Sequence, residues 1–280
     1  MIDKYFTTED EVKLHYLEGG TGQPLVIVHG WRSEAAEWSF NLDELAKYYH
    51  VYFLELRGHG RSGKPDYGYR ISRLAKDLQE FIAHFQDKKI NLMGHSMGCF
   101  VILNYIDLFG QDMIQKLILI DNPTRVSIDP NESDSERKSH GGTFKDIWAL
   151  YDAFMISSAE GGKEFNRQAP APEDDISFSS PYYIENQKLP RQKTDNEFMA
   201  KLFLNLSTND VRDIVKRINV PSLYIRGATS RCTFAETGKW ITENNSNFSE
   251  VVFSRDDYGR HSMFCTNPKK FNSIVREFLN

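Results

Sequence analysis

Two hydrophobic patterns alternate along the chain. In the first, consecutive apolar residues form short runs of the kind that predicts buried strands, at 25–28, 51–54, 90–93, 116–120, 220–225 and 250–253. In the second, apolar residues recur every three or four positions and predict helices, at 37–48, 69–85, 100–110, 143–157, 198–206, 234–243 and 268–279. Residues 12–17 alternate apolar and polar side chains, which is typical of a half-exposed strand.

Strands that alternate with helices predict an α/β fold with a mostly parallel central sheet and helices on both faces. The alternation stops over residues 122–209, where helix-like segments are separated by turn residues. We expect these residues to form a helical cap inserted into one core domain, made of residues 1–121 and 210–280. The alternative is that the helices pack beside the sheet without covering a site. Within this region, the charged residues 131–139 predict a mobile loop.

Composition narrows the class of protein. With 40% hydrophobic and 26% charged residues, the chain of 280 residues is typical of a water-soluble globular protein. Its net charge of −5 and the lack of a basic cluster argue against nucleic acid or an anionic membrane as a partner. The first ten residues have no signal-peptide core, and no apolar run approaches the roughly 20 residues that a membrane helix needs. We therefore expect a cytoplasmic protein.

The cysteine pattern predicts neither a disulfide framework nor a metal site. Cys99, Cys232 and Cys265 are too few for the first, and their spacing fits no zinc motif. We expect no metal and no cofactor. The sequence leaves the oligomeric state open.

A candidate nucleophile lies where the strand at 90–93 gives way to a helix. Gly94, Ser96 and Gly98 form a Gly-x-Ser-x-Gly sequence at this point, and strand, sharp turn and helix are the context of a nucleophile elbow. The two glycines allow the tight backbone conformation that exposes the Ser96 hydroxyl. The backbone N–H of Met97, at the start of the helix, then points toward the place where an oxyanion would form.

Four features, taken in chain order, resemble the α/β-hydrolase fold. They are the triplet His29-Gly30-Trp31, the turn Arg57-Gly-His-Gly-Arg-Ser62, the elbow itself and a late histidine in a loop, His261. The resemblance covers the chain outside residues 122–209. It implies a serine nucleophile at Ser96 rather than the aspartate of the haloalkane dehalogenases and epoxide hydrolases. A serine hydroxyl then needs a neighbouring base, which the resemblance places at His261.

The acid that would orient His261 departs from the commonest pattern of this family. The family usually carries an aspartate about three residues after the glycine that ends the strand at 220–225, and no carboxylate follows Gly227 until Glu236. Some members carry the acid at the end of the preceding strand instead, where this chain has Asp121. We expect Asp121 to be the acid. The alternatives are that it only caps its strand, or that Asp256 or Asp257 takes the role.

The same resemblance assigns the second oxyanion donor and a pocket. The backbone N–H of Trp31 would join that of Met97, and the Trp31 indole would form part of the pocket wall. An aromatic cap would make the substrate a small apolar or aromatic acyl compound. The cap residues proposed for the pocket are Trp148, Tyr151 and Phe154, with Tyr182, Tyr183 and Phe198 as further candidates.

Three functions remain open at this point. The first is a serine hydrolase that cleaves a carboxylic ester, a lactone or a similar acyl compound through an acyl-enzyme. The second is a cofactor-independent ring-cleaving dioxygenase of the same fold, in which a His261–Asp121 pair deprotonates the substrate. The third is a non-enzymatic ligand-binding protein. Oxygen consumption that survives Ser96→Ala would favour the second function, and slow turnover with tight ligand retention the third.

Overall fold

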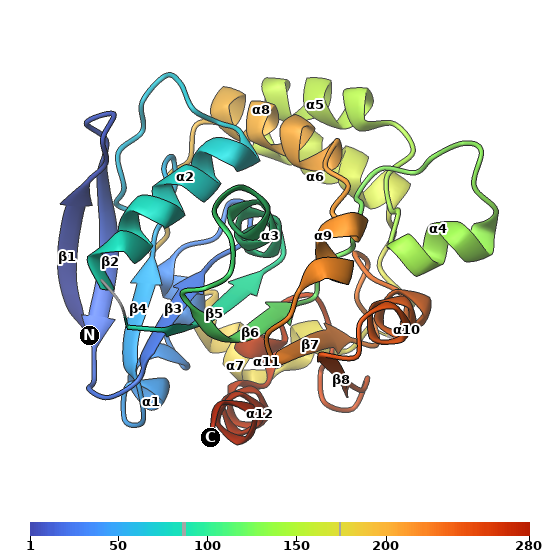
Figure 1. The fold of residues 1–280 in the computed structure, drawn as a ribbon. Helices are drawn as coiled ribbons and strands as arrows, with labels where there is room; N and C mark the ends of the chain where they lie inside the picture. The colour runs from blue at the N-terminus through green and yellow to red at the C-terminus, as the bar shows by residue number, and fades with distance from the viewer. Residues whose placement is uncertain (86–87, 174) are drawn as a thin grey trace.

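A computed structural model describes residues 1–85, 88–173 and 175–280 of the chain. Within these residues, one eight-stranded sheet runs through the molecule in the order β1-β2-β4-β3-β5-β6-β7-β8 (Figure 1). The pairs β1/β2 and β2/β4 are antiparallel, and the remaining neighbours are parallel. The strands are β1 Ile2–Thr7, β2 Lys13–Gly19, β3 Pro24–Val28, β4 His50–Leu54, β5 Ile90–His95, β6 Ile114–Ile120, β7 Ser222–Gly227 and β8 Phe248–Phe253.

Helices cover both faces of the sheet. One hydrophobic core lies between the sheet and the face covered by α2 and α3, and a second lies on the opposite face beneath α1, α11 and α12 (Figure 1). This arrangement confirms the predicted α/β fold class. The helices are η1 Ala35–Trp38, α1 Leu42–Leu45, α2 Ile71–Ile82, η2 Ala83–Phe85, α3 Met97–Phe109, α4 Asp134–His140, α5 Ile147–Ile156, α6 Ser158–Gln168, η3 Ser177–Ser179, α7 Pro181–Asn186, α8 Asn196–Ser207, α9 Arg212–Arg217, α10 Ala235–Asn244, α11 Met263–Thr266 and α12 Pro268–Leu279.

Between β6 and β7 the described residues form helices α4 to α9 and no named strand. Helices α5, α6 and α8 pack against one another at the top of Figure 1, beyond α2 and α3. The bridge between Arg125 and Asp210 brings the two ends of the predicted cap, residues 122–209, together. This segment therefore leaves the sheet at the carboxyl end of β6 and returns beside its own starting point.

Three local predictions differ from the structure. The predicted mobile loop at 131–139 contains most of helix α4, because Ser133 and Glu136 form a capping box at its start. The helix predicted at 37–48 is replaced by the short η1 and α1, separated by Ser39 to Asn41. Strand β1 was not predicted, because most of its residues are exposed and no apolar pattern marks a strand that is joined to the sheet along a single edge.

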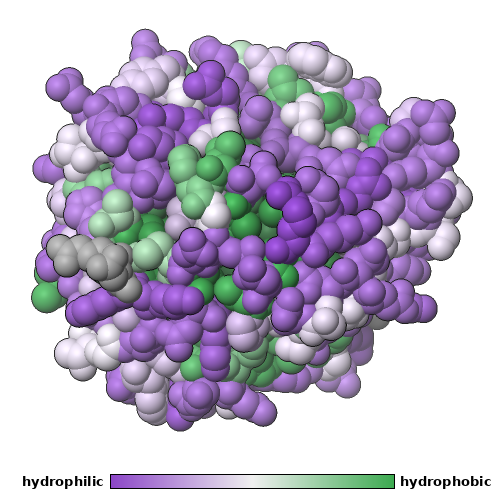
Figure 2. Space-filling view, viewed as in Figure 1, coloured by the Kyte–Doolittle hydropathy of each residue, from purple (hydrophilic) through white to green (hydrophobic). Residues whose placement is uncertain are grey.

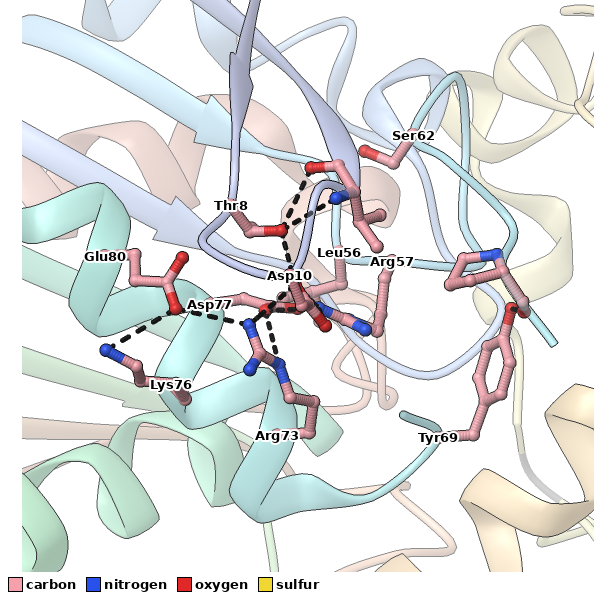
Figure 3. A network of polar contacts seen from close by, with 12 residues as sticks. Thr8, Asp10, Leu56, Arg57, Ser62, Tyr69, Arg73, Lys76, Asp77 and Glu80 are labelled. Atoms are coloured by element: carbon pink, nitrogen blue, oxygen red, sulfur yellow. Dashed lines mark hydrogen bonds and ion pairs between the residues drawn. The ribbon is translucent and has the colours of Figure 1, made fainter. Parts of the chain in front are cut away.

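A buried ionic network fixes the glycine-rich turn at 57–62 to the rest of the sheet (Figure 3). The guanidinium of Arg57 is fully buried and donates to both oxygens of Asp77 on α2, at 2.6 Å each. It also contacts Asp10, in the β1–β2 turn, at 3.1 Å. Arg73 bonds the same two aspartates at 2.9 Å. The network thus ties three segments that are distant in sequence to one position.

The face shown in Figure 2 is largely hydrophilic, with smaller hydrophobic patches between the charged side chains. None of the helices in the described residues is both long enough and apolar enough to cross a membrane.

Candidate active site

Ser96 lies between β5 and α3 in a strained backbone conformation, with φ of 52° and ψ of −120°. Left-handed values such as this are costly for a residue with a side chain and gather at functional sites. The flanking glycines are required by space as well. A Cβ at Gly98 would lie 2.2 Å from the carbonyl oxygen of Val28, and one at Gly94 would lie 2.8 Å from Ile102. The predicted strand–turn–helix elbow is therefore the observed local structure.

The predicted acid and base lie in contact. Asp121 follows β6 and is fully buried, and its Oδ2 lies 2.6 Å from Nδ1 of His261, which follows β8. The Asp121 backbone also has a left-handed φ, of 48°. Because Nδ1 faces the carboxylate, the tautomer that donates there leaves Nε2 as the nitrogen able to accept a proton.

The loop after β7 supplies hydrogen-bond donors to Asp121 in place of a carboxylate. The backbone N–H of Gly227 and the hydroxyl of Thr233 donate to Oδ1 of Asp121, at 3.0 and 2.9 Å. The hydroxyl of Ser230 donates to Oδ2, the oxygen that also faces His261. Ser230 is the third residue after Gly227, the position at which the resemblance predicts an aspartate. Sequence reasoning missed Ser230 and Thr233, although their position after a parallel strand was a signal.

The weaker candidate acids lie elsewhere. Asp257 binds Lys270 at 2.5 Å and Ser254 at 2.7 Å, and the Asp256 side chain is almost fully exposed beside Arg255. No hydrogen bond between either carboxylate and His261 occurs in the described part of the chain. Asp121 is thus the carboxylate that the fold brings to the histidine.

Ser96 and His261 line one cavity of about 220 Å³. Within the described residues, no hydrogen bond joins the hydroxyl of Ser96 to the imidazole of His261. In structures without substrate such contacts are commonly long and tighten only when substrate binds. The cavity opens at the carboxyl ends of the parallel strands, which is where open α/β sheets bind their ligands.

The two residues predicted to supply the oxyanion donors line the same cavity. Trp31 and Met97 both line it, and their backbone N–H groups have no acceptor among the residues that the structure describes. Gly30 lets the two segments approach closely, because a Cβ there would lie 2.9 Å from His95 and 3.2 Å from the Cβ of Ser96. The indole N–H of Trp31 donates to the carbonyl of Met199 on α8, at 2.9 Å.

Neutral histidines shape the turns around the site. His59 accepts the backbone N–H of Arg32 at Nε2, at 3.1 Å, and burial lowers the pKa of His59 to about 3. His29 accepts the N–H of Leu56 in the same way, at 3.0 Å, and burial lowers its pKa as well. An imidazole that accepts a hydrogen bond must be neutral, so both lowered pKa values agree with the geometry.

His95 fixes the loop that carries His261. Its Nε2–H donates to the carbonyl of His261 at 2.9 Å, and the two rings lie 4.6 Å apart. Burial lowers the pKa of His95 well below its ordinary range, and the nearby His261 lowers it further. The hydrogen bond and the ring contact together join strand β5, which ends at His95, to the loop that carries His261.

The imidazole of His261 has a shifted pKa. Burial acts to lower this pKa, but the neighbouring Cys232 sulfur and the Asp121 carboxylate act in the opposite sense and outweigh it. The pKa of His261 therefore lies above its ordinary value of 6.5. Cys232 itself lines the cavity, and sequence reasoning did not connect it with the site.

The cavity wall is apolar but differs from the predicted wall. Besides Trp31, Ser96, Met97, Cys232 and His261, it is lined by Phe100, Pro123, Val126, Thr143, Phe144, Phe165, Phe203 and Leu206. The predicted Trp148 does not line this cavity, and 61% of its side chain is exposed. Tyr151 and Phe154 also lie outside the lining, although Phe154 packs edge-on against Trp31 with ring centres 4.8 Å apart. Tyr182 and Tyr183 pack edge-on against other aromatic rings, and Phe198 stacks on Tyr69; none of the three lines the cavity.

No cluster of metal-binding side chains is found in the described part of the chain. Across residues 1–85, 88–173 and 175–280, no three or more His, Cys, Asp or Glu side chains are grouped so that they could hold a metal ion.

Comparison with known proteins places this geometry in a family. Residues 23–268 match the family model described as alpha/beta hydrolase fold. A soluble epoxide hydrolase of Corynebacterium sp. is 33% identical over 109 residues, which are 39% of this chain and 38% of that protein. The (E)-2-((N-methylformamido)methylene)succinate hydrolase of Acinetobacter baylyi is 28% identical and is matched over 98% of its length and 100% of this chain. Among solved structures, the bromoperoxidase from Bacillus anthracis superposes with a TM-score of 0.83 at 22% identity, over 99% of both chains.

The family match covers most of the chain and includes the elbow, Asp121 and His261. The matched relatives are enzymes, and a hydrolase role is common to several of them. The chain therefore belongs to the alpha/beta hydrolase fold family, as an enzyme with a hydrolase role.

Proposed function

We propose that this enzyme is a serine hydrolase that cleaves a carboxylic ester, a lactone or a similar acyl compound through an acyl-enzyme. The observation that carries the proposal is the 2.6 Å contact between His261 Nδ1 and Asp121 Oδ2, at the edge of a cavity that Ser96 also lines. A carboxylate behind an imidazole, with a strained serine in front of it, is the arrangement by which a neutral hydroxyl becomes a nucleophile.

In the acylation step, Ser96 Oγ attacks the substrate carbonyl while His261 Nε2 takes the hydroxyl proton. The new C–O bond pushes the carbonyl electron pair onto oxygen. The backbone N–H groups of Trp31 and Met97 would donate to this oxyanion, and losing one such donor typically costs roughly 10²–10³ in rate. Asp121 stabilises the imidazolium that forms.

Collapse of the tetrahedral intermediate breaks the bond to the leaving group, which takes the proton from His261. A water molecule then attacks the acyl-enzyme by the same route. His261 takes the water's proton and returns it to Ser96 Oγ as the ester bond breaks. The enzyme is left in its starting protonation state, so His261 carries the proton in both halves of the reaction.

The cavity supports a small apolar acyl group as the substrate moiety. Its volume of about 220 Å³ is below the roughly 300–1,000 Å³ of common ligand pockets. Its walls are mostly aromatic and aliphatic side chains, several of them from the segment between β6 and β7. We propose that residues 122–209 act as a lid, since Val126, Phe144 and Phe203 of that segment line the cavity.

Ser96→Ala tests the proposal directly. The variant should lose turnover of short p-nitrophenyl esters and should no longer be labelled by a fluorophosphonate, whereas the wild type is labelled on Ser96. Ser207→Ala, a buried hydroxyl on α8 outside the cavity lining, is the matched control and should still be labelled. Labelling of the Ser96→Ala protein at an equal rate would refute the assignment.

The dioxygenase alternative keeps the same histidine and carboxylate but needs no nucleophilic serine. The recorded His261–Asp121 contact, with no hydrogen bond from Ser96 to His261 in the described residues, is the observation in its favour. Oxygen consumption with a 3-hydroxy-4-quinolone that persists in Ser96→Ala would support it over ester hydrolysis. The non-enzymatic alternative is set aside, because the family and its relatives are enzymes.

A further inference from the structure

Cys232 is a nucleophile in the cavity that the hydrolytic mechanism does not use. It lies in the loop between β7 and α10 and lines the cavity together with Ser96 and His261. The other two cysteines are enclosed in the core: Cys99 is 0% exposed and Cys265 is 3% exposed. Burial raises the pKa of both buried thiols, that of Cys265 to about 12. Because the thiolate is the reactive form, those two thiols are inert at neutral pH.

The fold holds Cys232 in place beside the base. Its backbone N–H donates to the Ser230 hydroxyl at 3.1 Å, and Ser230 in turn donates to Asp121. On its other side, Thr233 also bonds Asp121, at 2.9 Å. The residue is therefore bracketed by two hydroxyls bound to the carboxylate that orients His261. Its side chain lines the same cavity as the imidazole of His261.

A histidine and a carboxylate lie close to this thiol. His261, from the loop after β8, lines the same cavity, and Asp121 lies 2.6 Å from Nδ1 of its imidazole. A thiol beside a histidine that is itself held by a carboxylate can react as a thiolate paired with the imidazolium. Cys232, His261 and Asp121 thus form a second nucleophile–base–acid set that shares two members with the first.

We propose that Cys232 is a covalent modification site for small α,β-unsaturated carbonyl compounds, and that its modification stops turnover at Ser96. The second half of this proposal depends on the proposed hydrolase function, and the first half does not. The conjugated carbonyl would enter the same apolar cavity as the substrate and meet the thiolate instead of the serine.

The addition is balanced without an oxidant or a leaving group. The thiolate of Cys232, paired with the imidazolium of His261, forms a bond from its sulfur to the β-carbon of the compound. The electron pair of the carbon–carbon double bond moves to the α-carbon, which takes a proton from the imidazolium, and the neutral ring regains its proton from water. The adduct then fills a cavity of about 220 Å³, so that an ester can no longer reach Ser96.

N-ethylmaleimide is a small probe of this chemical class. At pH 6 to 7, intact-protein and peptide mass spectrometry should show one adduct, on Cys232, before any on Cys99 or Cys265. Esterase activity should fall in step with that adduct. Cys232→Ser should resist inactivation, with each protein compared with its own untreated activity, and Cys265→Ser should be inactivated like the wild type. Early modification of Cys99 or Cys265, or full activity in the protein modified on Cys232, would overturn the proposal.

The role of the histidine has a separate readout. An ordinary thiol with a pKa of about 8.5 is mostly protonated at pH 6. The imidazole of His261 is positively charged at that pH, because its pKa lies above 6.5, and this charge stabilises a neighbouring thiolate. His261→Asn removes the charge and should therefore slow the modification at pH 6 by about tenfold or more. The difference should shrink as the pH approaches 9. Asp121→Asn should act in the same direction and serves if His261→Asn does not fold. A rate with equal pH dependence in wild type and both variants would contradict the proposal.

Ser96→Ala separates this proposal from the proposed function. The variant should still be modified on Cys232 at a rate similar to the wild type, since the serine takes no part in the addition. If fluorophosphonate labelling of the wild type fails while maleimide modification of Cys232 proceeds, the hydrolase mechanism falls and the thiol site remains. If the serine is labelled and Cys232 is unreactive at pH 7, the thiol proposal falls alone.

Discussion

Asp121 is the residue on which the local geometry of the site depends. Its two carboxylate oxygens accept from Gly227, Ser230, Thr233 and His261, and these donors come from two separate segments, the end of β7 with the loop after it and the loop after β8. A carboxylate held in this way cannot rotate away from the imidazole, so the tautomer of His261 is set by the fold. The predictions at the residue scale concern this carboxylate and the proton on the ring.

Asp121→Asn should lower kcat by roughly 10³–10⁴, because an amide in this position favours the wrong tautomer of His261. Adding Ser230→Asp should restore at least tenfold of that loss, since Ser230 reaches the oxygen that faces the imidazole. Ser230→Asn in the same background is the control and should restore nothing. Steady-state kinetics with a p-nitrophenyl ester would decide, and equal activity of the two double variants would contradict the role of the carboxylate.

The pH dependence of kcat/KM follows from the raised pKa of His261. Only the neutral imidazole can take a proton, so activity is lost as the pH falls through this pKa, and the acid limb should lie above pH 6.5. Cys232→Ser removes one cause of the raised pKa and should move the limb to lower pH. Cys265→Ser should leave it in place. An acid limb at or below pH 6.5 in the wild type would be inconsistent with the environment of this histidine.

At the scale of elements, the hydrophobic pattern of the sequence predicted the strands of the sheet better than the helices around it. Buried parallel strands are mostly apolar, and most of them were found within a few residues of their predicted bounds. Helix α5 shows what the pattern lacks: its apolar face was evident, but which side chains reach the cavity depends on packing against α6 and α8. Trp148 is consequently exposed, whereas Phe165 on α6 lines the cavity without having been singled out.

Motif and chain order were enough to name candidate site residues. Ser96, Asp121 and His261 were named from the sequence, and the structure places the last two in contact. Cys232, Ser230 and Thr233 were not, because only the closure of the β7 loop over β6 brings them to Asp121. Contacts between loops that are about 110 residues apart have no local sequence signal.

The network around Arg57 gives a stability prediction for the elements that it joins (Figure 3). Asp77→Asn removes the fully buried carboxylate partner of Arg57 and should lower the free energy of unfolding by about 3 kcal/mol, since the buried guanidinium keeps only Asp10 as a carboxylate partner. Glu9→Gln breaks only a surface pair with Lys76 and should cost about 0–1 kcal/mol. Urea unfolding followed by circular dichroism measures both. Similar losses in the two variants would show that the buried network is not what anchors the turn.

At the scale of the whole molecule, the cavity lies between the carboxyl ends of the parallel strands and the segment that connects β6 to β7. Phe165→Ala should enlarge it on the side of that segment and raise kcat/KM for longer acyl chains relative to shorter ones. Trp148→Ala, on the exposed face of α5, should leave the ratio unchanged. A series of p-nitrophenyl esters from acetate to octanoate measures the ratio. A shift caused by Trp148→Ala rather than by Phe165→Ala would place the acyl group in a different part of the molecule.

We expect Ser96 to carry the acyl group during turnover. Rapid acid quenching of the enzyme with p-nitrophenyl butyrate, followed by peptide mass spectrometry, tests it directly. A butyryl group should appear on the peptide that contains Ser96, should accumulate within the first turnover and should be absent from Ser96→Ala. Turnover that continues in the Ser96→Ala protein, or a butyryl group on another residue as the only adduct, would contradict the account.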